Sequence, residues 1–398
     1  MKRFKKIYTI AFAMLALCSC EHDSDLENGD IDVSTQENDY IFFDTEVNSR
    51  GALIYGEDFE YNFNVLGYKY PKGLQNGWYQ VETQASQSNS TYKVFDNVPQ
   101  TVTYNSDGTH TYTPAKEWEK KDYSFFAWYP DVDGTTLTWS GVTAEKTPFL
   151  TYKLDRTSTA NHKDVMTACV IDHNSSISKS VFFTMQHRLS AIDIVARSYV
   201  NAAALGENID ATARIKIKSV TVDLKNLLYD TAKIPLNTEN DERNTYTLKG
   251  SNTPETATTA SYSILGTSTN DDVTLVFEGD EAATANLSLG TNSTMILIPQ
   301  ADYKNEEGAE IKGNLECTIS IEYDIENEGG NSIWDTVYAG MNEEEIPSKT
   351  PSQLVKLNAL NEGIRYEIEL TFTKSGVAIS VMEPDGWNKL DNIQHEFE

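Results

Sequence analysis

Short runs in which apolar and polar residues alternate recur along most of this chain, and they constrain its fold more than any other feature. A period of two puts alternate side chains on opposite faces of a β-strand. Clusters of Gly, Asn, Asp and Ser separate the runs, as expected of turns between strands, and helical periodicity is nearly absent. The pattern predicts an antiparallel all-β fold. The clearest runs are residues 59–68, 122–130, 180–187, 190–200, 213–224, 293–300, 317–325, 365–372 and 377–383.

The length of the chain, 398 residues, exceeds that of one typical domain, so we expect two. A polar stretch at residues 174–179 (NSSISK) lies between two groups of predicted strands. We therefore predict an N-terminal domain over residues 39–177 and a C-terminal domain over residues 178–398, which ends in a C-terminal tail.

The first nineteen residues have the features of a lipoprotein signal peptide. A basic segment (MKRFKK) precedes an apolar run at residues 7–17 that is too short to span a bilayer stably. Leu17-Cys18-Ser19-Cys20 then resembles a bacterial lipobox, in which Cys20 carries the lipid. Cys18 is the weaker candidate because the bulky Leu17 would precede the cut, and an ordinary secretion peptide is the alternative. Residues 20–38 are acidic and polar, which predicts a disordered tether.

The charge balance is strongly acidic. The formal net charge is −28, and it becomes −32 without the four basic residues of the signal segment (28 positive against 60 negative). Such a surface repels nucleic acid and anionic lipid and favours solubility outside the cell. Cys169 and Cys317 both lie in alternating runs, which predicts buried free thiols rather than a disulfide.

The sequence contains no familiar catalytic signature, and we predict no catalytic residue, metal site or cofactor. Residues 131–134 (DVDG) begin like a calcium loop, but the twelfth position is Val142 where a Glu is needed, so a polar turn is expected. His162, Asp164, Cys169 and His173 have loose spacing and mixed ligand character, which is weak evidence for a metal. A carboxylate pair of a glycosidase stays open as an alternative, although no two carboxylates stand out.

Several pieces, in chain order, resemble the fimbrillin family of Bacteroidetes, the lipoprotein subunits of surface fimbriae. Trp118 followed by DYSFFAWYP resembles the family's Trp…Phe-x-Ala-Tyr-Tyr-Pro strand, and FFTMQHRLSAIDI resembles its Phe-x-His-x-Leu-x-x-Ile strand. The long loops of the second half depart from the family pattern. The other matching pieces are DVMTA (164–168), ILIPQ (296–300) followed by ISIEY, and LNEGIRYEIELTF leading to Trp387.

The resemblance implies two transthyretin-like antiparallel β-sandwich domains in tandem, in a protein exported as an outer-membrane lipoprotein. It implies a structural subunit that supports cell adhesion, with other fimbrial subunits as partners and the membrane as a partner through the lipid on Cys20. It also implies that a trypsin-like surface protease removes the lipidated N-terminal piece with the first strand. A strand from the neighbouring subunit then fills the groove that this strand leaves.

The segment at residues 40–50 fits the role of the removable strand. Ile41, Phe43 and Val47 point to one side of the strand and the even-numbered residues of 40–46 point to the other, so one face is apolar and suits a sandwich core. Between Lys6 and Lys69 the only Lys or Arg is Arg50, and Gly51 follows it. We therefore predict cleavage between Arg50 and Gly51; a surface arginine in a turn is the alternative.

The C-terminal tail is the candidate donor strand. After Trp387 its apolar residues are few, and Leu390, Ile393 and Phe397 are the best candidates to fill a groove. A frayed acidic tail is the alternative, and it would suit a tip subunit that accepts a strand but supplies none. A second class of function also stays open, namely a surface-anchored lipoprotein that binds glycan or host protein without polymerising.

Overall fold

The structure is a computed structural model of the whole chain, and the residues that it describes all lie beyond Asn38, in the unit Asp39–Glu398. The predicted signal peptide and tether lie outside the described residues. The described residues are 39–47, 59–75, 77–84, 92–95, 99–140, 148–198, 205, 209, 213–227, 231–237, 258–265, 273–275, 283–286, 294–300, 303–304, 310–311, 315–357, 360–382 and 393–394.

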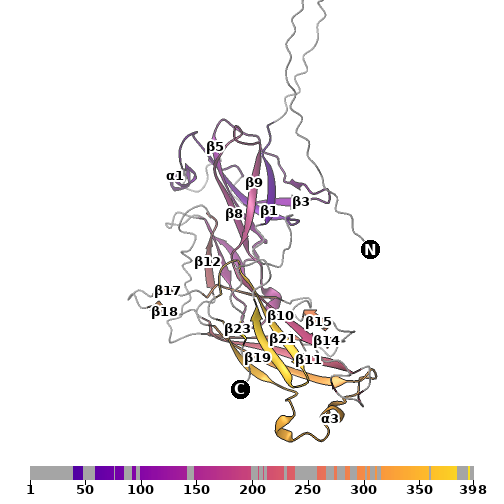
Figure 1. Cartoon of the computed structure of the whole chain (residues 1–398). Helices are drawn as coiled ribbons and strands as arrows, with labels where there is room; N and C mark the ends of the chain where they lie inside the picture. The colour runs from indigo at the N-terminus through magenta and orange to yellow at the C-terminus, as the bar shows by residue number, and fades with distance from the viewer. Residues whose placement is uncertain are drawn as a thin grey trace, which may run out of the picture. The chain divides into compact units, whose positions relative to one another are not determined.

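A seven-stranded sheet contains most of the strands of the first half of the chain. Its order is β1-β9-β8-β5-β2-β3-β4, and Figure 1 shows β1 beside β9 in this sheet. Neighbouring strands are antiparallel except for β1 and β9, which are parallel. The strands are β1 (Phe42–Val47), β2 (Phe63–Tyr70), β3 (Gln100–Tyr104), β4 (His110–Thr111), β5 (Asp122–Tyr129), β8 (Met166–His173) and β9 (Ser180–His187).

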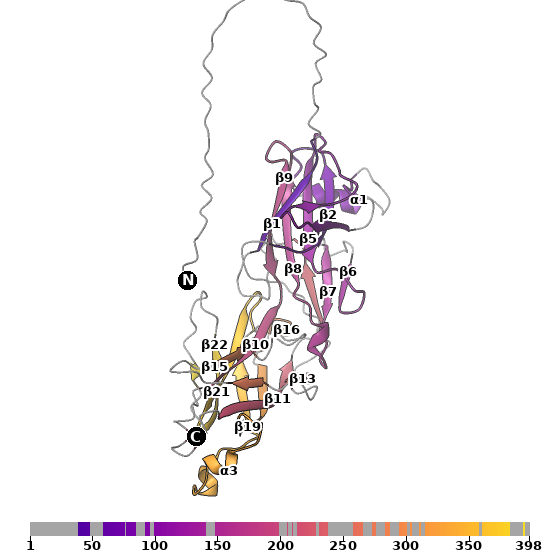
Figure 2. The same ribbon diagram turned by 90° about the vertical axis from the view of Figure 1, so that its right-hand side faces the viewer.

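Two larger sheets contain most of the strands of the second half. One has the order β15-β10-β21-β22-β23, with β16 also paired to β10, and the other has the order β13-β11-β19-β20, with β14 also paired to β11. Figure 2 shows β10, β21 and β22 side by side. The first sheet uses β10 (Ser190–Ser198), β15 (Ala283–Asn286), β16 (Met295–Leu297), β21 (Arg365–Thr373), β22 (Gly376–Met382) and β23 (Ile393–Gln394). The second uses β11 (Arg214–Leu227), β13 (Thr258–Leu265), β14 (Val273–Leu275), β19 (Leu315–Glu326) and β20 (Ser352–Leu357).

The remaining described elements are small. A three-stranded sheet has the order β12-β7-β6, and β17 pairs with β18. The bounds are β6 (Leu137–Ser140), β7 (Phe149–Lys153), β12 (Thr231–Pro235), β17 (Tyr303–Lys304), β18 (Glu310–Ile311), the helices α1 (Gly77–Gln84) and α3 (Trp334–Val337), and the 3-10 turns Thr159–Asn161 and Glu343–Glu345.

The all-β prediction is confirmed. Among the described strands most pairs are antiparallel and two are parallel, β1 with β9 and β10 with β21. In both pairs many residues separate the partners, which leaves room for the crossover that parallel pairing needs. A local turn would have forced the antiparallel arrangement.

The predicted boundary at residue 177 falls between β8 and β9, which pair with each other in the seven-stranded sheet. Residues 180–187 therefore belong with the first sheet, on the other side of the boundary from where the sequence placed them. The polar turn at 174–179 is a hairpin connection, which has the same composition as a linker. A division into tandem domains stays a prediction.

Two hydrophobic clusters form the core of the described residues. The smaller one contains Ile41, Phe43, Val181 and Phe183 together with aromatic residues of β2 and β5. The larger one joins β10, β11, β19 and β21 and extends to α1 and to the outer side of β5. Adjacent residues of β5 belong to different clusters: Phe125 lies in the smaller cluster and Phe126 in the larger one. The seven-stranded sheet thus has apolar residues on both faces.

Candidate functional site: the first strand and its groove

The first strand has one buried face. Ile41 and Phe43 are 1% and 4% exposed, whereas Phe42 between them is 53% exposed. The alternation predicted from the sequence is therefore present at these three positions. Val47 lies in β1 opposite Met185. Ile41 and Phe43 fill the groove that is the candidate functional site.

Phe43 lies inside a cage of aromatic rings. Its ring stacks on Phe183 of the neighbouring strand β9 and meets Phe125 of β5 edge to face. Such pairs add stabilisation beyond the burial of area. Phe43 is therefore the side chain that ties β1 to the rest of its core. The ring-centroid distances are 5.3 Å to Tyr112, 5.4 Å to Phe125, 5.7 Å to Phe183, 6.3 Å to Phe95 and 6.5 Å to Phe63.

Backbone bonds hold the segment 39–47 on two sides. On one side β1 pairs with β9 in parallel from Phe42 to Val47. On the other side the Ile41 N–H donates to the Lys116 carbonyl at 2.8 Å, and the Trp118 N–H donates to the Asp39 carbonyl at 2.7 Å. The segment therefore has strand-like partners on both edges near its start, which a plain edge strand lacks.

Side chains also bind the segment 39–47 to its neighbours. The Tyr112 hydroxyl donates to the Ile41 carbonyl at 3.0 Å, and the Lys179 ammonium lies 2.7 Å from the Asp39 carboxylate. The ion pair is half exposed, so it contributes little. Burial raises the pKa of Tyr112, which keeps its hydroxyl protonated as a donor. Sequence reasoning missed Tyr112 and Lys179; Trp118 alone carried a signal, as part of the family pattern.

One polar atom under β1 has no partner among the described residues. The Thr45 hydroxyl oxygen is buried and makes no hydrogen bond there. His110 stacks on Phe59 with centroids 6.3 Å apart, and burial lowers its pKa, so the imidazole is neutral near pH 7. The residues that surround Ile41 and Phe43 are mainly apolar and aromatic, which suits an apolar strand.

The other predicted site residues are spread over the chain. Cys20, Arg50, Gly51, Leu390 and Phe397 lie outside the described residues. Ile393 lies in β23, which pairs antiparallel with β22 through Val381 opposite Ile393. Ile393 of the candidate donor strand thus lies at the edge of the sheet β15-β10-β21-β22-β23.

The residues considered for metal binding do not come together. Within the described part of the chain no group of three His, Cys, Asp or Glu residues could hold a metal ion. The His162 ring bonds to the Ile296 amide and the Asp155 carbonyl, and the His187 ring bonds to Asp164 at 2.9 Å. Residues 131–134 form the expected polar turn, in which the Asp133 carboxylate accepts bonds from the amides of residues 135–137.

Cys169 and Cys317 are free, as predicted, but they differ in burial. Cys317 is buried, and burial raises its pKa to about 12. Cys169 is only half-buried, so the prediction of burial is wrong for it. Among the described helices none is long and apolar enough to cross a membrane.

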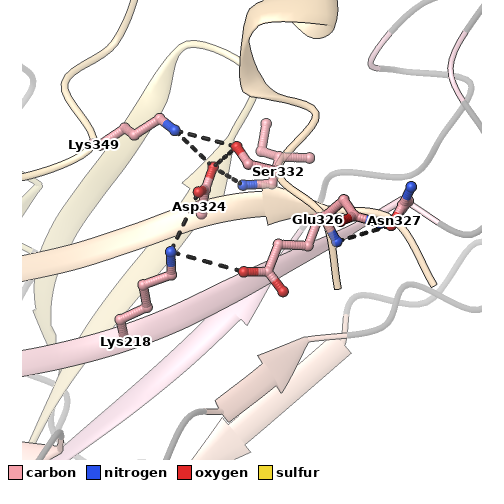
Figure 3. Close-up of polar contacts among 8 residues, drawn as sticks. Lys218, Asp324, Glu326, Asn327, Ser332 and Lys349 are labelled. Atoms are coloured by element: carbon pink, nitrogen blue, oxygen red, sulfur yellow. Dashed lines mark hydrogen bonds and ion pairs between the residues drawn. The ribbon is translucent and has the colours of Figure 1, made fainter. Parts of the chain in front are cut away.

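A cluster of polar side chains lies in the C-terminal half and is centred on Asp324 of β19. Its carboxylate accepts bonds from Ser332 at 2.8 Å, Lys349 at 3.0 Å and Lys218 at 3.3 Å (Figure 3). Burial by itself would raise the pKa of Asp324, but the bonds from Lys349 and Ser332 outweigh it and lower the pKa. Because Ser332 and Lys349 belong to the connection between β19 and β20, the cluster holds that connection against β19. Its role is structural.

Comparison with known proteins identifies the class to which this fold belongs. The profile of the fimbrillin-like family matches residues 72–384. The chain belongs to this family, and the resemblance found in the sequence is confirmed. Fimbrillins are structural proteins rather than enzymes, and the family supports a fimbrial or adhesive role at the cell surface.

Solved structures also resemble the chain. A candidate cell adhesion protein from Bacteroides uniformis is 15% identical, with 87% of this chain and 97% of that chain covered and a TM-score of 0.36. One from Bacteroides ovatus is 12% identical, with coverage of 91% and 99% and a TM-score of 0.39. The fimbrial anchor protein Mfa2 from Porphyromonas gingivalis is 11% identical, with coverage of 90% and 99% and a TM-score of 0.29. No curated protein matches the chain.

Proposed function

We propose that this protein is a structural subunit of a bacterial surface fimbria, exported as an outer-membrane lipoprotein through Cys20. A trypsin-like surface protease cuts between Arg50 and Gly51, so that the lipidated piece and β1 are no longer joined covalently to the rest of the chain. A strand from a neighbouring subunit then takes the place of β1, so that cutting is coupled to assembly. The observation that carries this proposal is that the strand before Arg50 buries Ile41 and Phe43 in the core.

The energetics support coupling between loss of β1 and gain of a partner. Burying a large apolar side chain contributes roughly 1.5–3 kcal/mol, so two such residues contribute about 3–6 kcal/mol. That is comparable to the whole stability of an ordinary domain, about 5–15 kcal/mol. Loss of β1 also leaves the β9 edge without its ladder partner. A subunit without β1 therefore has a strong tendency to bind an apolar strand from elsewhere.

The candidate donor is the C-terminal tail with Leu390, Ile393 and Phe397. To serve as donor it has to leave β22, with which β23 pairs over Ser380 and Val381. Among the described residues, Ile393 and Gln394 make this pairing.

Limited trypsin treatment of the purified precursor tests the proposal. We expect a new N-terminus at Gly51, followed by a ladder of SDS-resistant oligomers. The Arg50→Gln variant is the matched control, and it is expected to stay monomeric under the same treatment. A new N-terminus elsewhere argues against the predicted site. A chain cut at Gly51 that loses β1 and stays a stable monomer refutes assembly by strand exchange.

A second candidate function is a surface-anchored lipoprotein that binds glycan or host protein without polymerising. Phe42 and Phe182 favour it, since they are 53% and 48% exposed. Phe182 lies opposite Asp44 in the parallel register, so the two rings project from the same face of neighbouring strands. Exposed aromatic rings of this kind can stack on sugars. Binding of the uncut monomer on a glycan array, lost in Phe182→Ala, would support this function instead.

A further inference from the structure

The segment 39–47 makes its main described contacts with residues that lie well after it in the chain. Its ladder partner is β9, its second backbone partner is residues 116–118, and its ring cage includes Phe125 and Phe183. Each of these contacts is non-covalent, and the partners named lie beyond the connection between β1 and β2. Cutting that connection therefore removes a tether and leaves the contacts in place.

We propose that residues 39–47 stay bound in the seven-stranded sheet after the chain is cut behind them. The cut then prepares the groove for exchange but does not open it, and the incoming strand has to displace a bound peptide. This inference rests on the proposed function, in which the cut follows Arg50. The arrival of the partner strand, and not the protease cut, then determines when assembly occurs.

Phe43 is the residue that controls release. Its ring is 4% exposed and has to pass from the cage of five rings into water before the segment can leave. The ladder bonds differ in this respect, because an incoming strand can replace them one at a time. The neighbouring ring of Phe42 is already exposed and need not leave a buried site when the segment is released. Phe42 and Phe43 therefore form a matched pair on one strand for comparison.

The experiment uses the full chain with the recognition sequence of a site-specific protease inserted after Arg50. The cut is made without any partner, and the products are separated by gel filtration and identified by mass spectrometry. We expect the fragment that contains residues 39–47 to elute with the rest of the chain. A fragment that elutes separately in the first pass, while the remaining chain keeps its β circular dichroism, overturns the inference.

Competing peptides test the role of the ring without any risk that a variant chain fails to fold. An excess of labelled synthetic peptide of residues 39–50 is added to the cut chain, and its incorporation is followed over hours. The Phe43→Ala peptide is expected to compete about 100-fold less well or worse, and the Phe42→Ala peptide about as well as the natural one. Equal competition by all three peptides overturns the assignment of control to Phe43.

Failure of this inference and failure of the proposed function give different results. If the cut chain holds the fragment but never exchanges it for a strand of a second copy, retention stands and assembly by strand exchange fails. If the fragment leaves at once and oligomers still form, assembly stands and retention fails. Oligomers that form only as the bound fragment is released support both.

Discussion

Replacing Phe43 with alanine in the uncut chain tests whether β1 belongs to the core energetically as well as geometrically. The ring is 4% exposed and lies within 6.5 Å, centroid to centroid, of five other aromatic rings. Substitution of a buried Phe by Ala costs about 3–5 kcal/mol, because burial is lost and a cavity remains. Around a cage of rigid rings little collapse is expected, so the upper part of this range is the better estimate.

Urea unfolding provides the assay. With a slope of about 1–3 kcal/mol per M, a loss of about 3–5 kcal/mol lowers the urea midpoint for the first core by about 1–5 M. Amide exchange in β9 should rise as well, since β9 loses the packing of its partner strand.

The Phe42→Ala variant is the control, because this ring on the same strand is 53% exposed and its loss should change stability by at most about 0.5–1 kcal/mol. If Phe43→Ala costs no more than Phe42→Ala, then β1 does not stabilise this core, and both proposals about the groove lose their physical basis.

Three further predictions concern the rest of the chain. Asp324→Asn should destabilise the fold by about 1–3 kcal/mol and speed amide exchange around Lys349. Because the pKa of Asp324 is lowered, the stability that its carboxylate contributes is present above about pH 4 and is lost as the pH falls further. Burial lowers the pKa of His162, whose Nδ1 accepts a hydrogen bond from the Ile296 amide. The free energy of unfolding should therefore have its full value above about pH 6.5 and decrease below that pH. His162→Gln should remove this decrease. Cys317, with its pKa raised to about 12, should resist alkylation at pH 8 until the protein unfolds, as mass spectrometry can check.

The sequence predicted the strands well where one face of a strand is buried and the other is not. Residues 180–187 were predicted as a strand and form β9, and Ile41 and Phe43 were predicted to face inward and do. In both places the alternation of side chains is a local property, which short stretches of sequence report directly. The polar stretch at residues 174–179 connects the paired strands β8 and β9, and its composition alone does not distinguish a hairpin turn from a linker.

The choice of strand partners was not predictable in the same way. The pairing of β1 with β9 joins residues about 140 positions apart and runs parallel, and the sequence contains no signal for either property. Tyr112 and the backbone of residues 116–118 were missed for the same reason, since their contact with Ile41 depends on how the sheet curls back toward its first strand. Such contacts arise from the joint packing of distant aromatic residues.

The sequence by itself determined the all-β class, the inward face of the first strand, and the position of the lone arginine between Lys6 and Lys69. The tertiary structure decided which groups hold that strand and from which sides. The reason is physical: an alternating pattern specifies which side chains must leave water, but the partners they meet depend on every other strand that buries its own apolar face in the same core.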